Sequence, residues 1–85
     1  MNDDLATITL EANGALIDYL GETAEIAMGP PYTVERVRGV AAERWPAAVG
    51  LISQSACARG DTLLADDDPV SDGETIVLVP PVSGG

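Results

Sequence analysis

Few residues in this chain could carry out chemistry, and most of them lie in unsuitable contexts. The 85 residues include no histidine, the commonest general base and a frequent metal ligand. The single cysteine, Cys57, lies in the apolar stretch SACA with no base nearby in sequence, so we expect a buried structural thiol. One cysteine cannot hold an iron–sulfur cluster or a structural zinc ion. We therefore expect no catalytic activity from this chain alone.

Three adjacent carboxylates at residues 66–68 precede Pro69 and invite a comparison with calcium sites. The spacing of an EF-hand loop and its final glutamate are missing, so we expect a solvated loop and no metal site. The sequence also contains neither a GxGxxG nor a GxxxxGK[ST] phosphate-binding loop. We expect no bound cofactor.

The C-terminal stretch VPPVSGG, residues 79–85, has the clearest chemical potential. Pro80 and Pro81 each fix φ near −65° and favour an extended segment that projects away from the body of the protein. Gly84 and Gly85 lack side chains, so they could thread a channel too narrow for other residues. The reactive group at the tip is the α-carboxylate of Gly85.

A carboxylate is a poor electrophile and must be activated before it can transfer a group. Adenylation by a separate, ATP-dependent enzyme would convert the carboxylate of Gly85 into a mixed anhydride. A sulfur nucleophile could then produce a thiocarboxylate. In this hypothesis the chain carries the reactive atom while other proteins supply the catalysis.

The charge balance restricts the partners. Fourteen acidic residues face four arginines and no lysine, for a net charge of −10. Nucleic acids and anionic membranes are therefore poor partners, whereas a protein with a basic groove would be attracted. Alternatively, the acidity only keeps a small domain soluble. The acidic N-terminus is unlike a signal peptide and no apolar run could span a bilayer, so we expect a cytoplasmic protein.

The elements that must position the tail follow from periodicity. Residues 6–12 alternate as a half-buried strand, and Thr33 is a good N-cap for a helix over residues 34–44. Gly39 in that helix is expected to mark a close approach to the sheet. The remaining elements are a short helical connection at 15–21, a strand at 23–28 and a last strand at 74–80. Between them, the region 49–65 holds the apolar segment VGLIS and is expected to contain one or two short strands, with a turn at Gly60-Asp61.

The last strand is apolar on both faces. Ile76 and Leu78 point to one face, Val77 and Val79 to the other. One face covers the helix, and the second leads into the rigid tail and resembles a docking surface. The order strand, strand, helix, strands predicts an α+β fold of the β-grasp type, with a mixed sheet and one main helix packed across one face. We expect a β-grasp domain over residues 1–78 and an extended tail over residues 79–85.

The ending DGETIVLVPPVSGG (residues 72–85), behind this order of elements, resembles the MoaD/ThiS family of ubiquitin-like sulfur carriers. The ending PPVxGG is typical of the MoaD branch. The resemblance implies a β-grasp fold and a thiocarboxylate on Gly85, formed by a MoeB-like adenylyltransferase that uses ATP and a sulfur donor. It also implies a MoaE-like large subunit of molybdopterin synthase, in which the sulfur reaches a pterin precursor. Gly84 would give access, and the residues expected to dock on the partner are Val77, Val79, Pro80, Pro81 and Val82.

Two departures from the family pattern keep alternatives open. Leu78 and Val79 stand where MoaD-like chains often carry phenylalanines, and this chain has no phenylalanine. It also has no lysine, which argues against chains of this protein linked to itself but not against Gly85 modifying a lysine of another protein. The alternatives are sulfur carriers for thiamine, tRNA or cysteine pathways, a ubiquitin-like protein modifier, and a plain β-grasp interaction module.

Overall fold

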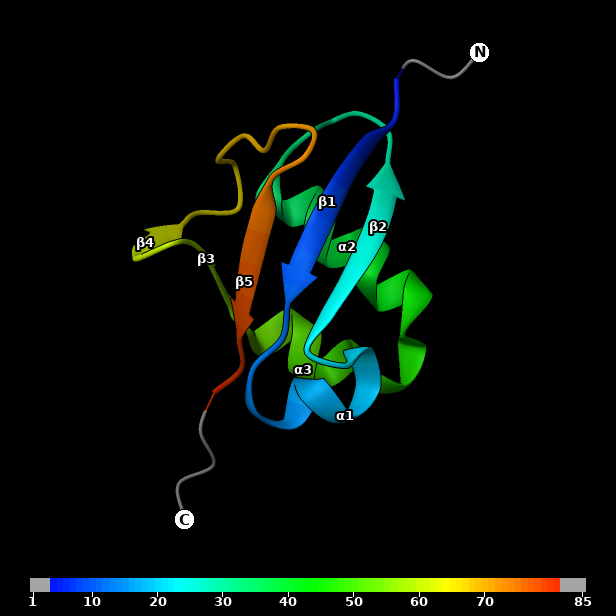
Figure 1. Cartoon of the computed structure of the whole chain (residues 1–85), viewed down its shortest axis with the longest axis vertical. Helices are drawn as coiled ribbons and strands as arrows, with labels where there is room; N and C mark the ends of the chain where they lie inside the picture. Colours follow the sequence, from blue (N-terminus) through cyan, green and yellow to red (C-terminus); the bar gives the residue numbers. More distant parts are fainter. Residues whose placement is uncertain (1–3, 82–85) are drawn as a thin grey trace.

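Five strands form one mixed sheet in the computed structural model, which describes residues 4–81 (Figure 1). The strand order is β2-β1-β5-β3-β4, with β1 and β5 parallel and the other neighbours antiparallel. The strands are β1 (Ala6–Glu11), β2 (Thr23–Met28), β3 (Ala56–Arg59), β4 (Thr62–Leu64) and β5 (Thr75–Val79). The helices are α1 (Ile17–Leu20), α2 (Val34–Arg44) and α3 (Val49–Gln54), with 3-10 turns η1 (Gly14–Leu16) and η2 (Pro46–Ala48).

The longest helix, α2, crosses one face of this sheet, which confirms the α+β arrangement predicted from the sequence (Figure 1). The side chain of Thr33 accepts a hydrogen bond from the backbone N–H of Arg36 (3.3 Å), as expected of an N-cap. Val34, Val37 and Ala41 are fully buried against the sheet. No helix within residues 4–81 has both the length and the apolar character needed to cross a bilayer.

One prediction about α2 was wrong. Gly39 is exposed, and a Cβ added to it would meet no atom within 4 Å, so it does not mark a close approach to the sheet. The buried stripe of the helix runs through Val37 and Ala41, and Gly39 lies between them on the solvent side.

The strands expected within residues 49–65 are confirmed as β3 and β4, but the apolar segment VGLIS at the start of this region forms α3. Pro46 opens η2, and the chain continues directly from this turn into α3. Ile52 is fully buried while Val49 is exposed, which gives a short helix one apolar side. The hydroxyl of Ser55 donates to the carbonyl of Leu51 (2.6 Å) at the end of the helix. A short apolar run fits a buried strand and a buried helix equally well.

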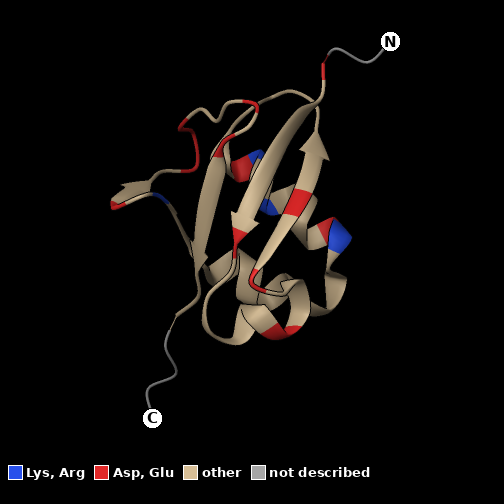
Figure 2. Ribbon diagram, in the orientation of Figure 1, with Lys and Arg blue, Asp and Glu red and all other residues tan. Residues whose placement is uncertain are grey.

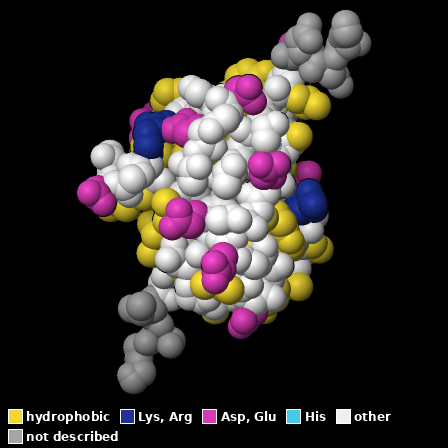
Figure 3. Space-filling view, in the orientation of Figure 1, with side chains coloured by type: hydrophobic (Ala, Val, Ile, Leu, Met, Phe, Trp, Pro, Cys, Tyr) yellow, Lys and Arg dark blue, Asp and Glu magenta, His cyan; other side chains and the backbone are white. Residues whose placement is uncertain are grey.

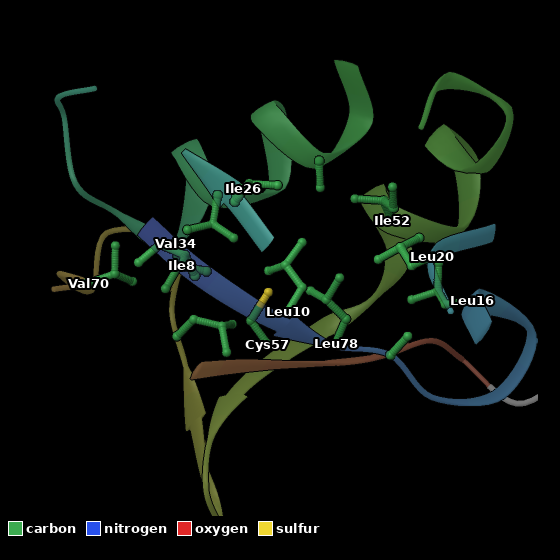
Figure 4. Close-up of a cluster of buried hydrophobic side chains, with 14 of the residues drawn as sticks. Ile8, Leu10, Leu16, Leu20, Ile26, Val34, Ile52, Cys57, Val70 and Leu78 are labelled. Atoms are coloured by element: carbon green, nitrogen blue, oxygen red, sulfur yellow. The ribbon is translucent and has the colours of Figure 1, made fainter. Parts of the chain in front are cut away.

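The core lies between the sheet and the helices (Figure 4). Ile8 and Leu10 of β1 and Leu78 of β5 are fully buried, as the alternation in the sequence predicted. Cys57 of β3 points into the same cluster, and Ile52 reaches it from α3 (Figure 4). The central pair β1–β5 is thereby fixed in position by packing, and β5 leads directly into the tail.

The acidic loop at residues 66–68 caps the start of α2. The backbone N–H of Val34 donates to the carbonyl of Asp68 (3.0 Å), and that of Glu35 donates to the carbonyl of Asp66 (2.9 Å). These bonds satisfy N–H groups that the first turn of a helix leaves without a partner. The carboxylate of Asp68 accepts from the N–H of Ala65 (2.7 Å) and closes the loop on itself. Within residues 4–81, no group of three or more acidic, histidine or cysteine side chains is placed to hold a metal ion.

Candidate functional site

The strand that carries the tail, β5, exposes its outer side chains. Ile76 and Leu78 are fully buried on the inner face, whereas Val77 is half-buried and Val79 is 42% exposed on the outer face. The strand ends at Val79, where the chain enters the segment Pro80–Pro81. The exposed side of β5 and the start of the tail therefore form one continuous surface.

Strand pairing extends this surface onto β3 and β4. Ala56 lies opposite Val79 and Ala58 opposite Val77, and on the other side Ala58 pairs with Leu63. Directly paired residues point to the same face of a sheet. Leu63 is 72% exposed, although it is a large apolar side chain. We call the set Ala56, Ala58, Leu63, Val77 and Val79 the outer apolar face; Ala58, between the two neighbouring strands, is itself buried (6% exposed).

The sequence indicated only part of the outer apolar face. Val77 and Val79 were predicted from the alternation of β5, and the structure places them there. Ala56, Ala58 and Leu63 were missed, because their side depends on the register of β3 and β4. With four and three residues, these strands are too short to show a clear alternation.

The part of the same sheet surface that β1 and β2 form is polar. Glu11 of β1 lies beside Val77, and Thr9 faces Glu25 of β2. Figure 2 shows acidic residues along these strands and around the loops, and Figure 3 shows hydrophobic atoms reaching the surface beside β3, β4 and the end of β5. The apolar half is thus bordered by negative charge. A partner that covers both halves needs an apolar patch next to basic groups.

The base of the tail rests on the turn that follows β1. The side-chain amide of Asn13 donates to the carbonyl of Leu78 (3.3 Å). A Cβ added to Gly14 would lie 3.4 Å from Cγ of Pro80, which shows how closely the proline ring approaches this turn. An open cavity of about 550 Å³ adjoins this contact; its lining includes Ala15, Leu51 and Pro81.

The remaining residues predicted to act in the tail cannot be placed. Val82, Gly84 and Gly85 lie outside the described residues. Pro80 is half-buried and Pro81 exposed, so the described part of the tail leaves the body of the protein over these two residues.

Cys57 is buried on the inner face of β3, which confirms the expected buried thiol. Burial raises the pKa of the thiol, and the neighbouring guanidinium of Arg38 lowers it in part. The same guanidinium donates to Sγ of Cys57 (3.4 Å) and to the carbonyl of Ser55 (3.1 Å), and it forms an ion pair with Asp66. Arg38 therefore joins α2, β3 and the acidic loop. A protonated, enclosed thiol of this kind is a poor nucleophile.

A second ion pair holds the loop that precedes β5. The guanidinium of Arg59 donates to the carboxylate of Glu74 and to the carbonyl of Pro69 (2.8 Å). The other carboxylate oxygen of Glu74 accepts from the N–H of Ser71 (2.8 Å). The hydrogen bond from Arg59 is the main cause that lowers the pKa of Glu74. This network lies at the opposite end of β5 from the tail.

Comparison with protein families finds a match to the model described as "ThiS family" over residues 10–85. Comparison with curated proteins finds no match.

Solved structures similar to this one include SAMP1 from Haloferax volcanii, with 19% identity, a TM-score of 0.78 and coverage of 94% of this chain and 100% of that one. Ubiquitin from Caldiarchaeum subterraneum has 22% identity, a TM-score of 0.64 and coverage of 95% and 99%. The complex of subunits 1 and 2 of the molybdopterin-converting factor from Helicobacter pylori contains a chain with 20% identity, a TM-score of 0.60 and coverage of 93% and 99%. These likenesses confirm the predicted β-grasp, ubiquitin-like fold.

Proposed function

Because this chain belongs to the ThiS family of ubiquitin-like sulfur carriers, we propose that it carries sulfur as a thiocarboxylate on Gly85 and serves as the small subunit of a molybdopterin synthase. The observation that carries the proposal is the family match over residues 10–85, which includes the Gly84-Gly85 ending. The proposal takes Gly85 as the terminal residue of the mature protein. Its α-carboxylate is then the group that reacts.

The chemistry takes two steps, both catalysed by a partner. In the first, an oxygen of the Gly85 carboxylate attacks the α-phosphorus of ATP and pyrophosphate leaves, which gives an acyl-adenylate. In the second, a sulfur nucleophile at the oxidation level of sulfide attacks the acyl carbon. A C–S bond forms, and the bond between the acyl carbon and the bridging oxygen of the adenylate breaks. AMP leaves with the electron pair of that bond. No oxidant or reductant is consumed.

We propose that the outer apolar face docks on the partner that holds the tail, first a MoeB-like adenylyltransferase and then a MoaE-like large subunit. Continuity supports this assignment, since the face includes Val79, the residue that directly precedes Pro80. An enzyme that encloses Gly85 also comes close to the end of β5, because only five residues, 80–84, separate Gly85 from Val79. Val82 would add to the contact on the tail side. The acidic border at Glu11 and Glu25 favours a basic rim on both partners.

The ending PPVSGG supports the molybdopterin assignment within the family, because it carries the MoaD form at Pro80, Pro81 and Val82. The structural likeness to a chain in the complex of subunits 1 and 2 of a molybdopterin-converting factor is consistent with this assignment. The test is reconstitution with the adenylyltransferase, the sulfur donor and the large subunit from the same genome. Product formation from the pterin precursor is expected with the full chain and none with a chain that lacks Gly85. Full product formation without Gly85 would overturn the proposal.

A second function, protein modification, has its own supporting observation. One similar structure is described as small archaeal modifier protein 1 from H. volcanii, with a TM-score of 0.77. In this alternative, Gly85 forms an amide with lysines of other proteins. Covalent conjugates of higher mass in cells, lost when Gly85 is deleted, would favour it over sulfur delivery.

A further inference from the structure

We infer that Asn13 and Gly14 are positioning residues that set the direction in which the tail leaves the sheet. The inference rests on the proposed function, since direction matters because an activating enzyme must receive the tail. Both residues lie in the turn between β1 and α1, far from the C-terminus in sequence. They contact the chain where β5 ends.

The side chain of Asn13 continues the β1–β5 ladder beyond its last backbone pair. The parallel pairing ends at Glu11 and Val77. One residue further along β5, the carbonyl of Leu78 accepts its hydrogen bond from the amide of Asn13. The side chain of Asn13 thus supplies the donor for the carbonyl of Leu78 at the point where the backbone of β1 no longer runs beside β5.

The use of Asn13 is unusual for its position. Asparagine before a helix commonly caps it by accepting from a backbone N–H. Here Asn13 stands at the N-cap of η1, but its side chain makes no bond to that turn. Only its backbone carbonyl does so, by accepting from the N–H of Leu16 (3.1 Å). The side chain is therefore free to bond to β5, and replacing it leaves the bonding of the turn intact.

Gly14 provides the surface on which the first proline of the tail rests. Its φ of +57° lies in the left-handed region, which glycine adopts readily and residues with a side chain disfavour. The ring of Pro80 lies against the position that a side chain would fill. Pro80 has a fixed φ of its own, so contact with its ring constrains the direction of the segment that follows.

The consequence is that the base of the tail is preorganised. With the bond from Asn13 and the contact at Gly14, Leu78 to Pro80 keep one direction relative to the sheet, so the outer apolar face and the tail reach the enzyme together. Without them, only a fraction of the molecules present the tail correctly, and the apparent affinity falls by that fraction. Loss of one ordinary hydrogen bond corresponds to a factor of about two to five.

The first experiment replaces Asn13 by aspartate, which keeps the shape and removes the donor. NOE spectra of the free protein are expected to show contacts between Hα of Gly14 and the ring protons of Pro80, weakened in Asn13→Asp. In ATP-dependent activation assays, Asn13→Asp is expected to raise KM for the carrier about two- to fivefold, with kcat unchanged. Absence of these contacts in the wild type, or a variant with unchanged contacts and KM, would overturn the inference.

The second experiment uses a matched pair of glycines. Gly60 has φ of +59°, close to that of Gly14, but a Cβ added to Gly60 would meet nothing within 4 Å. Asparagine tolerates the left-handed region better than most residues, so Gly14→Asn and Gly60→Asn carry a similar backbone cost. Only Gly14→Asn is expected to shift the Pro80 resonances and raise KM. Equal effects of the two variants on KM would contradict the role assigned to Gly14.

The two readouts separate this inference from the proposed function. If no adenylyltransferase activates the wild-type chain, the proposed function fails, while the NOE contacts still decide whether Asn13 and Gly14 hold the base of the tail. If the wild type is activated and the variants behave like it, the inference fails and the proposed function stands.

Discussion

Truncation of Leu63 to alanine is expected to weaken binding of the adenylyltransferase without unfolding the protein. Leu63 is 72% exposed on β4, at the rim of the outer apolar face. Complete burial of a leucine contributes about 2 kcal/mol, so covering the part that is still exposed would contribute about 1.5 kcal/mol. This difference corresponds to roughly a tenfold increase in Kd. Because the side chain is mostly exposed in the free protein, the free energy of unfolding should change by less than about 0.5 kcal/mol.

The matched control is Leu5→Ala. Leu5 is also a largely exposed leucine, at 49%, but it precedes β1 and lies beside Tyr32 and Val70, outside the outer apolar face. Isothermal titration calorimetry of the wild type and both variants against the adenylyltransferase measures the effect. A Kd for Leu63→Ala within twofold of the wild type, or an equal loss for Leu5→Ala, would refute the assignment of the docking face.

Three further predictions concern the polar contacts of the scaffold. Arg38→Met should lower the free energy of unfolding by about 1–3 kcal/mol in urea titrations, because the variant leaves Asp66 and a buried carbonyl without their charged donor; an unchanged stability would show that these bonds contribute nothing. Native Cys57 should react with a thiol reagent at least about 1,000-fold more slowly than the unfolded chain, since access requires opening of the core; rapid reaction would contradict its burial. The hydrogen bond from Arg59 lowers the folded-state pKa of Glu74, so the stabilisation by the Glu74 carboxylate is complete at neutral pH and is lost as the pH falls through that pKa. The difference in free energy of unfolding between the wild type and Glu74→Gln should therefore shrink from about pH 7 to about pH 3. A constant difference over this range would contradict the lowered pKa.

The elements with clear periodicity could be predicted from the sequence. The alternation around Ile8 and Leu10 identified β1, and Thr33 marked the start of α2. The segment beginning at Val49 could not be assigned, since a short apolar run fits a strand and a helix alike and only packing of Ile52 into the core decides. Gly39 was misjudged because its neighbours in space depend on the position of the helix relative to the sheet.

Some residues of the candidate site could likewise be predicted from the sequence, and others could not. Val77 and Val79 could be found from the sequence because β5 is long enough to show which side chains share a face. Leu63 required the pairing of three strands, and Asn13 required a contact across 65 residues. Tertiary contacts of this kind leave no local signal. The chemistry proposed for the tail, in contrast, rests on its residue types and on none of these tertiary contacts.

The central claim is that sulfur is carried on Gly85, and intact-mass spectrometry of the purified chain tests it most directly. The protein is incubated with ATP, a sulfur donor and the adenylyltransferase, and its mass is compared with that of a chain lacking Gly85. If Gly85 carries the sulfur, the mass increases by the difference between one sulfur and one oxygen; fragmentation locates the change on Gly85, and the truncated chain shows no change. A full-length chain ending at Gly85 that is never adenylated or thiolated, under conditions where a known substrate of the enzyme is, would contradict it.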